Sequence, residues 1–208
     1  MSHQRRILFL FNHDAAHQAA HIAGLAEEMA MRAQHQIIIA YGSEGIRQSV
    51  EKLMPAQAIA LMDWQSLALN PWMEKALTPF NRVAPVHRLQ RLDAKLSLFA
   101  SVDIVISPER TCLRVKCKLA GRAPKFIFVP HGAGDRSVTY HPEMAQFDYM
   151  LVSGQKVVDE MHAHGIITPD RCEIIGYPKF DTIDLSHRPR FFSNDRPTFL
   201  YNPHFDPK

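Results

Sequence analysis

The sequence has few cysteines and no long apolar run, and each absence argues against a class of protein. Its three cysteines, Cys112, Cys117 and Cys172, include no C-x-x-C pair. We therefore expect no disulfide framework, and a reducing, cytoplasmic location fits best. The apolar run at residues 7–11 is too short for a signal-peptide core. No segment approaches the roughly 20 apolar residues that span a bilayer.

Blocks of like charge are also missing. The chain has 24 Lys and Arg against 21 Asp and Glu, which gives a formal net charge of +3. Its basic residues are scattered, whereas proteins that bind nucleic acids usually concentrate them on one face. We therefore expect no nucleic-acid partner. The twelve histidines are the more unusual feature, because imidazoles change charge near neutral pH.

Length and composition indicate one globular domain and a shorter additional segment. The 208 residues correspond to about one and a third domains at roughly 150 residues per domain. Hydrophobic residues make up 46% and charged residues 22%, which are ordinary values for a folded protein. This composition argues against a disordered chain and against a small scaffold that needs disulfides or metal for its stability.

Apolar runs that alternate with helical segments predict an α/β fold. The continuous apolar run at 7–11 and the segment 36–41, with three isoleucines at its centre, predict strands that are buried on both faces, as in a parallel sheet. Helices are expected at 15–32 and 43–54, and a weaker third strand at 58–62. This order predicts a Rossmann-like parallel sheet flanked by helices.

The alternation resumes after a less readable stretch at 63–85 and a helical pattern at 86–100. Further helices are expected at 111–120 and 155–164, and further strands at 102–107, 125–129, 149–152 and 172–175. Glycine-containing turns follow the last three of these strands. Because open α/β sheets bind ligands at the carboxyl ends of their strands, these turns are candidate sites.

The end of the sequence predicts a change of domain. Residues 1–186 are expected to form the Rossmann-like domain, and 187–197, with two prolines and an Asn-Asp pair, to form a linker. The apolar residues that follow predict that 198–208 hold the first strand of a second domain.

His131 is the first candidate for chemistry, because it follows a buried strand in the run Val129-Pro130-His131-Gly132. Imidazole has an ordinary pKa of about 6.5, so a histidine placed there can take a proton from a hydroxyl near neutral pH. The alternative is a turn histidine that only bonds to the backbone.

Two further strand ends are weaker candidates. Gly176 permits a tight turn, Pro178 stiffens it, and Asp181 is placed to cap the next turn. The amides at Ser153 and Gly154 are placed to face a phosphate at a helix start, although a serine is equally expected there as a simple cap.

His13, His17 and His21 recur every fourth residue near the start of the first expected helix. Zinc accepts such pairs, but the sequence has no H-E-x-x-H motif and no nearby cysteine. We therefore expect a solvated or cleft-facing stripe with no metal. His13, just after the first strand, is a candidate to line an acceptor cleft.

Four short motifs occur in the order found in one family. They are the segments 130–132 (PHG), 147–154 (FDYMLVSG), 175–181 (IGYPKFD) and 199–203 (FLYNP). Together they resemble the CDP-glycerol glycerophosphotransferase family over roughly residues 100–206. Enzymes of that family resemble GT-B glycosyltransferases, in which two Rossmann-like domains enclose the active site. The resemblance implies that this chain is the N-terminal half of a GT-B fold.

The resemblance also implies an activity. Glycerol phosphate would pass from CDP-glycerol, or another nucleotide-activated donor, to a hydroxyl of a polyol-phosphate or glycan acceptor. His131 falls on the histidine that serves the family as base, and Gly132 and Ser153 would orient the acceptor. His204 would approach the donor phosphate from the second domain. No cofactor is implied, and the family's role in cell-envelope polymer synthesis suggests peripheral contact with the inner face of the membrane.

Two alternatives stay open at this point. One is another GT-B member, such as a glycosyltransferase or a nucleotide-sugar epimerase-like protein with a different donor. The other is a non-catalytic half-domain that only binds a ligand, because one half of a cleft does not hold both substrates.

Overall fold

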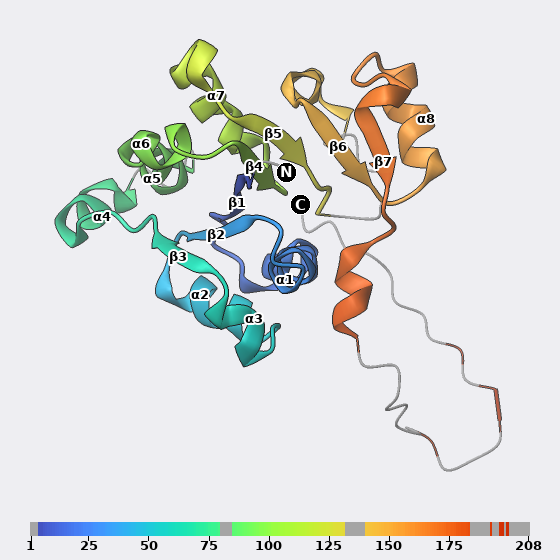
Figure 1. Ribbon diagram of the computed structural model, residues 1–208, viewed down its shortest axis with the longest axis horizontal. Coiled ribbons are helices and arrows are strands. Elements are labelled where there is room, and N and C mark those ends of the chain that lie inside the picture. Colours follow the sequence, from blue (N-terminus) through green and yellow to red (C-terminus); the bar gives the residue numbers. More distant parts are fainter. Residues whose placement is uncertain are drawn as a thin grey trace.

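The computed structural model describes residues 4–79, 85–131 and 140–183, together with positions 192, 196, 197 and 199. The described residues form seven parallel strands in one sheet, in the order β3-β2-β1-β4-β5-β6-β7 (Figure 1). The strands are β1 (Arg6–Phe11), β2 (Gln36–Tyr41), β3 (Asp63–Ser66), β4 (Ile104–Ser107), β5 (Lys125–Phe128), β6 (Tyr149–Val152) and β7 (Cys172–Ile174). This arrangement confirms the predicted Rossmann-like α/β class.

Helices cover both faces of the sheet (Figure 1). On one face lie the 3₁₀-helix η1 (Ala16–His21), α1 (Ala23–Met31), α2 (Glu44–Glu51) and α3 (Ala56–Ala60). On the other lie α5 (Val86–Ala94), α6 (Leu96–Ala100), α7 (Leu113–Leu119) and α8 (Gln155–Ala163). The remaining short elements are α4 (Pro71–Leu77), η3 (Arg110–Cys112), η4 (Ala120–Arg122), η6 (Pro142–Gln146), η7 (Pro169–Arg171) and η8 (Pro178–Thr182).

The sheet is buried on both sides because its central strands are apolar at most positions. Successive side chains of a strand point to opposite faces. Leu8 and Leu10 of β1 accordingly join the core beneath α5–α8, whereas Ile7, Phe9 and Phe11 join the core beneath η1 and α1–α3. Burial of these large side chains stabilises the fold by about 1.5–3 kcal/mol each.

The strand expected at 58–62 is wrong. Residues 56–60 form the helix α3, and the third strand follows at β3. The segment Ala56-Gln57-Ala58-Ile59-Ala60 has high helix propensity, which favours α3. Strand β3 lies at the edge of the sheet and pairs with β2 alone. Because no strand covers its other side, polar residues are tolerated there.

Two long helices that the sequence predicts are each divided. The segment at 15–32 becomes η1 and α1, with a break at Ile22, where φ is −129° and ψ −2°. The segment at 86–100 becomes α5 and α6, with Lys95 between them. In contrast, the helix capped by Ser43 is confirmed, since its side chain accepts a hydrogen bond from the Ile46 amide at 3.4 Å.

The strand order reverses direction between β1 and β4, and this is where a doubly wound sheet opens a crevice for ligands. Within 4–79, 85–131 and 140–183, no helix is both long and apolar enough to cross a bilayer. The predicted linker and the strand at 198–208 lie almost wholly outside the described residues, so the domain boundaries stay predictions.

Candidate functional site

A cleft of about 1170 Å³ lies at the carboxyl ends of the strands. Its walls come from the segment after β1, from the turns after β4 and β5, and from η1, α5, α7, η6 and η8. The cleft therefore includes the switch point between β1 and β4, the position that the fold favours for a ligand.

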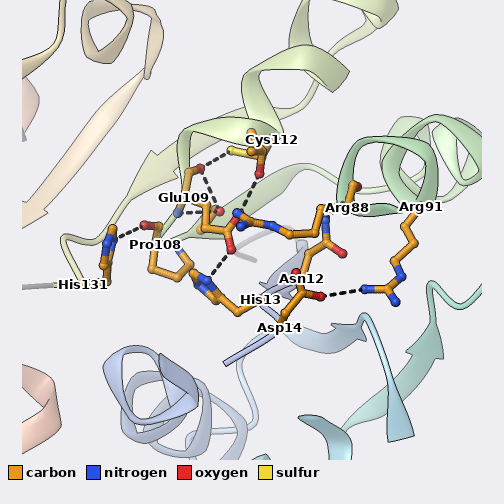
Figure 2. A network of polar contacts seen from close by, with 11 residues as sticks. Asn12, His13, Asp14, Arg88, Arg91, Pro108, Glu109, Cys112 and His131 are labelled. Carbon is orange, nitrogen blue, oxygen red and sulfur yellow. Dashed lines mark hydrogen bonds and ion pairs between the residues drawn. The ribbon is translucent and has the colours of Figure 1, made fainter. Parts of the chain in front are cut away.

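Glu109 anchors the polar floor of this cleft (Figure 2). Its backbone amide donates to Ser107 Oγ at 3.1 Å, which fixes the turn after β4. The buried carboxylate lies against His13 Nδ1, and it accepts hydrogen bonds from the Arg88 guanidinium and from Thr111 Oγ1 at 2.7 Å. Burial alone would raise the pKa of Glu109, but the hydrogen bond and charge of His13, together with Arg88, lower it to about 2. Glu109 is therefore a fixed negative charge.

His13 follows β1 and is 5% exposed. Since Glu109 is charged, its contact with His13 Nδ1 places a proton on that nitrogen. The other nitrogen, Nε2, is buried and has no hydrogen-bond partner among the described residues. His13 as a residue is among those that line the cleft.

His131 follows β5 and faces His13 across the floor of the cleft (Figure 2). Its Nδ1 lies 2.8 Å from the carbonyl oxygen of Pro108, which can only accept. The proton of the neutral ring is therefore on Nδ1, and the lone pair is on Nε2. The ring centroid of His131 lies 6.1 Å from that of His13 and 6.2 Å from that of His21.

His21 is the third member of a group of neighbouring histidines, together with His13 and His131. It is 3% exposed, its ring lies 5.6 Å from that of Tyr177, and its Nδ1 has no partner within the described ranges. Burial, followed by the charges of Lys179 and of neighbouring histidines, lowers the pKa of His21 to about 4. His21 is therefore uncharged at neutral pH.

Two arginines of helix α5 hold the segment that follows β1 in place. Arg88 binds Glu109, and its backbone carbonyl accepts a hydrogen bond from Asn12 Nδ2 at 2.9 Å. Arg91, one turn later and 6% exposed, lies 3.4 Å from Asp14. Gly42 makes room for this guanidinium, because a Cβ there would lie 3.0 Å from Arg91 Nη1.

Most charges around the cleft are already paired. Arg110 binds Glu143 at 3.3 Å and Arg114 binds Asp93 at 2.8 Å. Lys179 lines the cleft without a carboxylate partner in the part of the chain that the structure describes. Across the same part, no group of three or more histidine, cysteine or carboxylate side chains is arranged to hold a metal ion.

The structure brings some of the predicted site residues together and leaves others apart. His131 and all three histidines of the predicted stripe line the cleft, although His17 is exposed and the other two are buried. The remaining described candidates are not among the residues that line it: Ser153, Gly154, Gly176, Pro178 and Asp181. Gly132 and His204 lie outside the described residues.

The motif around Gly176 reaches the cleft through its neighbours. Gly176 has a φ of +76°, which permits the turn, and Pro178 is buried at the start of η8. Between and after them, Tyr177 and Lys179 project into the cleft. Gly176 and Pro178 shape this turn, and their contact with substrate stays a prediction.

Sequence reasoning missed Glu109, Arg88, Tyr177 and Lys179 as cleft residues. Glu109 carried a usable signal, since it follows the strand expected at 102–107 and a charged residue at a strand end is a site candidate. Arg88 carried none, because it lies within a helical pattern.

Solved structures with a similar fold include UDP-N-acetylglucosamine 2-epimerases, which are GT-B-like. One aligns with a TM-score of 0.61 and 15% identity, over 93% of this chain and 53% of its own. Another, a protein from Listeria monocytogenes assigned as such an epimerase, aligns with a TM-score of 0.58 and 11% identity, over 86% of this chain and 47% of its own. No protein-family profile matches the sequence, and a search of curated proteins finds no match.

At such low identity these comparisons show the fold alone. The chain spans about half the length of the two solved structures. It has the Rossmann-like fold of one half of a GT-B-like protein.

Proposed function

We propose that this chain is the acceptor-side half of a GT-B-type enzyme that acts on a nucleotide-activated substrate. The observation that carries the proposal is His131, whose Nδ1 is held by the Pro108 carbonyl in a cleft at the carboxyl ends of the strands. A histidine held in this way presents the Nε2 lone pair that a general base requires.

The reaction is transfer of glycerol phosphate from CDP-glycerol to an acceptor hydroxyl. The hydroxyl oxygen forms a bond to the phosphorus that carries glycerol, and the bond from that phosphorus to the oxygen of CMP breaks. His131 Nε2 takes the proton of the hydroxyl. The motif order from residue 130 to 203 supports this choice of donor. Lys179, which has no carboxylate partner among the described residues, supports an anionic substrate.

A second Rossmann-like domain completes the cleft in this proposal. It would bind the nucleotide, with His204 near the donor phosphate, and Gly132 would help to orient the acceptor. The residues after β6, Ser153 and Gly154, lie outside the cleft lining, so their proposed part is to shape the sheet edge. The protein would act in the cytoplasm, in peripheral contact with the membrane that holds a polymeric acceptor.

The likeness to UDP-N-acetylglucosamine 2-epimerases favours a second candidate, a nucleotide-sugar epimerase. That reaction also needs a positioned base, which here would act on a carbon-bound proton of the sugar. The two candidates share the site and differ in the donor and in the requirement for an acceptor.

The test is to supply each donor and identify the products. The chain, alone and joined to the second domain that this proposal requires, is incubated with CDP-glycerol or with UDP-N-acetylglucosamine, with and without a glycerol-phosphate acceptor. Phosphorus NMR follows the products. Acceptor-dependent release of CMP supports the transferase. Acceptor-independent change of the UDP-sugar supports the epimerase instead, and binding without turnover in either form supports a half-domain that only binds ligand.

A further inference from the structure

One end of the cleft, between η1 and η8, holds a positive charge that no described carboxylate balances. Among the described residues two carboxylates line the cleft, and each already has a cationic partner: Glu109 binds Arg88, and Glu143 binds Arg110 at 3.3 Å. Lys179 of η8 also lines the cleft and has no carboxylate partner within the same residues. Its ammonium group is therefore left for an anionic ligand to balance.

Histidines from three other segments surround this end of the cleft. The ring centroid of His21, in η1, lies 6.2 Å from that of His131. The neighbours whose charges act most strongly on His21 are all positive when protonated. They are Lys179 of η8, His131 after β5, His13 after β1 and His17 of η1. Because these groups act on one point with the same sign, the electrostatic potential there becomes more positive as the histidines take up protons.

The members of this group differ in their access to a ligand. His17 and His131 are exposed and Lys179 is half-buried, so each has surface at the cleft that it lines. His13 and His21 are buried, so they act on a ligand through their charge and not by contact. An anion held by Lys179 and His17 therefore stabilises the protonated form of the buried His21 as well.

The arrangement suits a tetrahedral oxyanion with two negative charges. The groups approach from several segments of the chain, and a tetrahedral anion presents oxygens in several directions, whereas a carboxylate presents two oxygens in one plane. A dianion about 6 Å from a unit charge gains about tenfold in affinity even at the dielectric constant of water. Phosphoryl groups have this shape and charge, and sulfate shares both.

We infer that the end of the cleft between η1 and η8 binds a dianionic phosphoryl group of the substrate through Lys179 and His17, with uptake of protons by the surrounding histidines. This inference rests on the proposed function, since it assigns the phosphoryl group to the substrate. The bound anion favours protonated imidazole, so its affinity rises as the pH falls. An anion held by Lys179 alone would bind equally at pH 7.5 and pH 5.5, because an ammonium group stays charged throughout that range.

The test uses sulfate, which keeps two negative charges over this pH range, whereas a phosphomonoester loses charge near a pKa of about 6. Proton–nitrogen NMR follows a sulfate titration of the intact chain at pH 7.5 and at pH 5.5, with chloride holding the ionic strength constant. Sulfate should bind about tenfold more tightly at pH 5.5, which corresponds to net uptake of about half a proton per pH unit. The pKa of His21, about 4 without sulfate, should rise when sulfate is added.

Substitutions separate the proposed site from general attraction of anions to the protein. Lys179→Gln should weaken sulfate binding about tenfold, since it removes one unit charge. Lys52→Gln is the matched control, because Lys52 is exposed at the end of α2 and does not line the cleft. His17→Gln should reduce the pH dependence of binding, whereas His162→Gln, at an exposed position of α8, should keep it.

Three results would each overturn the inference: equal sulfate affinity at the two pH values, an unchanged pKa of His21 with sulfate, or equal losses in Lys179→Gln and Lys52→Gln. Glycerol 3-phosphate should displace sulfate from the same amides, and failure to do so overturns the assignment to a substrate. If sulfate binds as expected but neither CDP-glycerol nor UDP-N-acetylglucosamine is turned over, the proposed function fails while the anion site stands. Turnover of either substrate without sulfate binding gives the reverse.

Discussion

Acidification from pH 7 to pH 5 should destabilise the fold through His21. This side chain is 3% exposed, and burial together with Lys179 (from η8), His131 (after β5), His13 (after β1) and His17 (from η1) lowers its pKa from 6.5 to about 4. At pH 5 the unfolded chain binds almost a full proton at this position, whereas the folded chain binds about a tenth of one. Stability is therefore complete above pH 6.5 and falls as the pH drops towards 4. Integrated from pH 7 to pH 5, the loss is about 2 kcal/mol.

The assay is urea unfolding at both pH values for the unsubstituted protein and for His21→Phe, which keeps an aromatic ring against Tyr177 and cannot titrate. The loss of unfolding free energy between pH 7 and pH 5 should be about 2 kcal/mol smaller in His21→Phe. His162→Gln, at an exposed position, should keep the full loss. If His21→Phe and the unsubstituted protein lose the same free energy on acidification, the buried, uncharged state assigned to His21 is refuted.

Two further predictions concern the floor of the cleft and the cysteines. Glu109→Ala leaves the buried His13 and the partly buried Arg88 without their carboxylate, so urea unfolding should show a loss of about 3 kcal/mol. Glu143→Ala breaks an exposed pair and should cost less than about 1 kcal/mol, and equal losses for the two variants would contradict the buried network. Burial raises the pKa of the Cys112 thiol to about 12, so N-ethylmaleimide should label exposed Cys117 in the folded protein and Cys112 only after unfolding, as mass spectrometry would show. Labelling of both at one rate would argue against this core.

The central strands could be predicted because a strand that is buried on both faces needs a run of apolar residues. Each position of the run Ile7-Leu8-Phe9-Leu10-Phe11 is apolar, and the strand β1 forms there. Strand β3 has no such apolar run. Its residues Asp63-Trp64-Gln65-Ser66 are extended because they pair with β2, and that pairing is a tertiary contact which local composition does not encode.

In the candidate site, too, some features could be predicted from the sequence and others could not. His131 and His13 could be predicted because each lies two or three residues after the end of a buried strand, and the carboxyl ends of parallel strands meet at one edge of the sheet. The bond between His13 and Glu109 could not, because it joins segments far apart in the sequence that become neighbours only when β1 pairs with β4. In the motif around Gly176, the glycine forms the turn and its neighbour Lys179 lines the cleft, a placement that the spacing of the motif did not predict.

The central claim is that this cleft activates an acceptor hydroxyl through His131. The most direct measurement is the rate of acceptor-dependent CMP release from CDP-glycerol, compared between the unsubstituted enzyme and His131→Ala, with the second domain present in both. A positioned general base contributes about 10²–10⁴-fold, so the rate should fall by that factor while the unfolding free energy stays nearly unchanged. An unchanged rate in His131→Ala would contradict the claim.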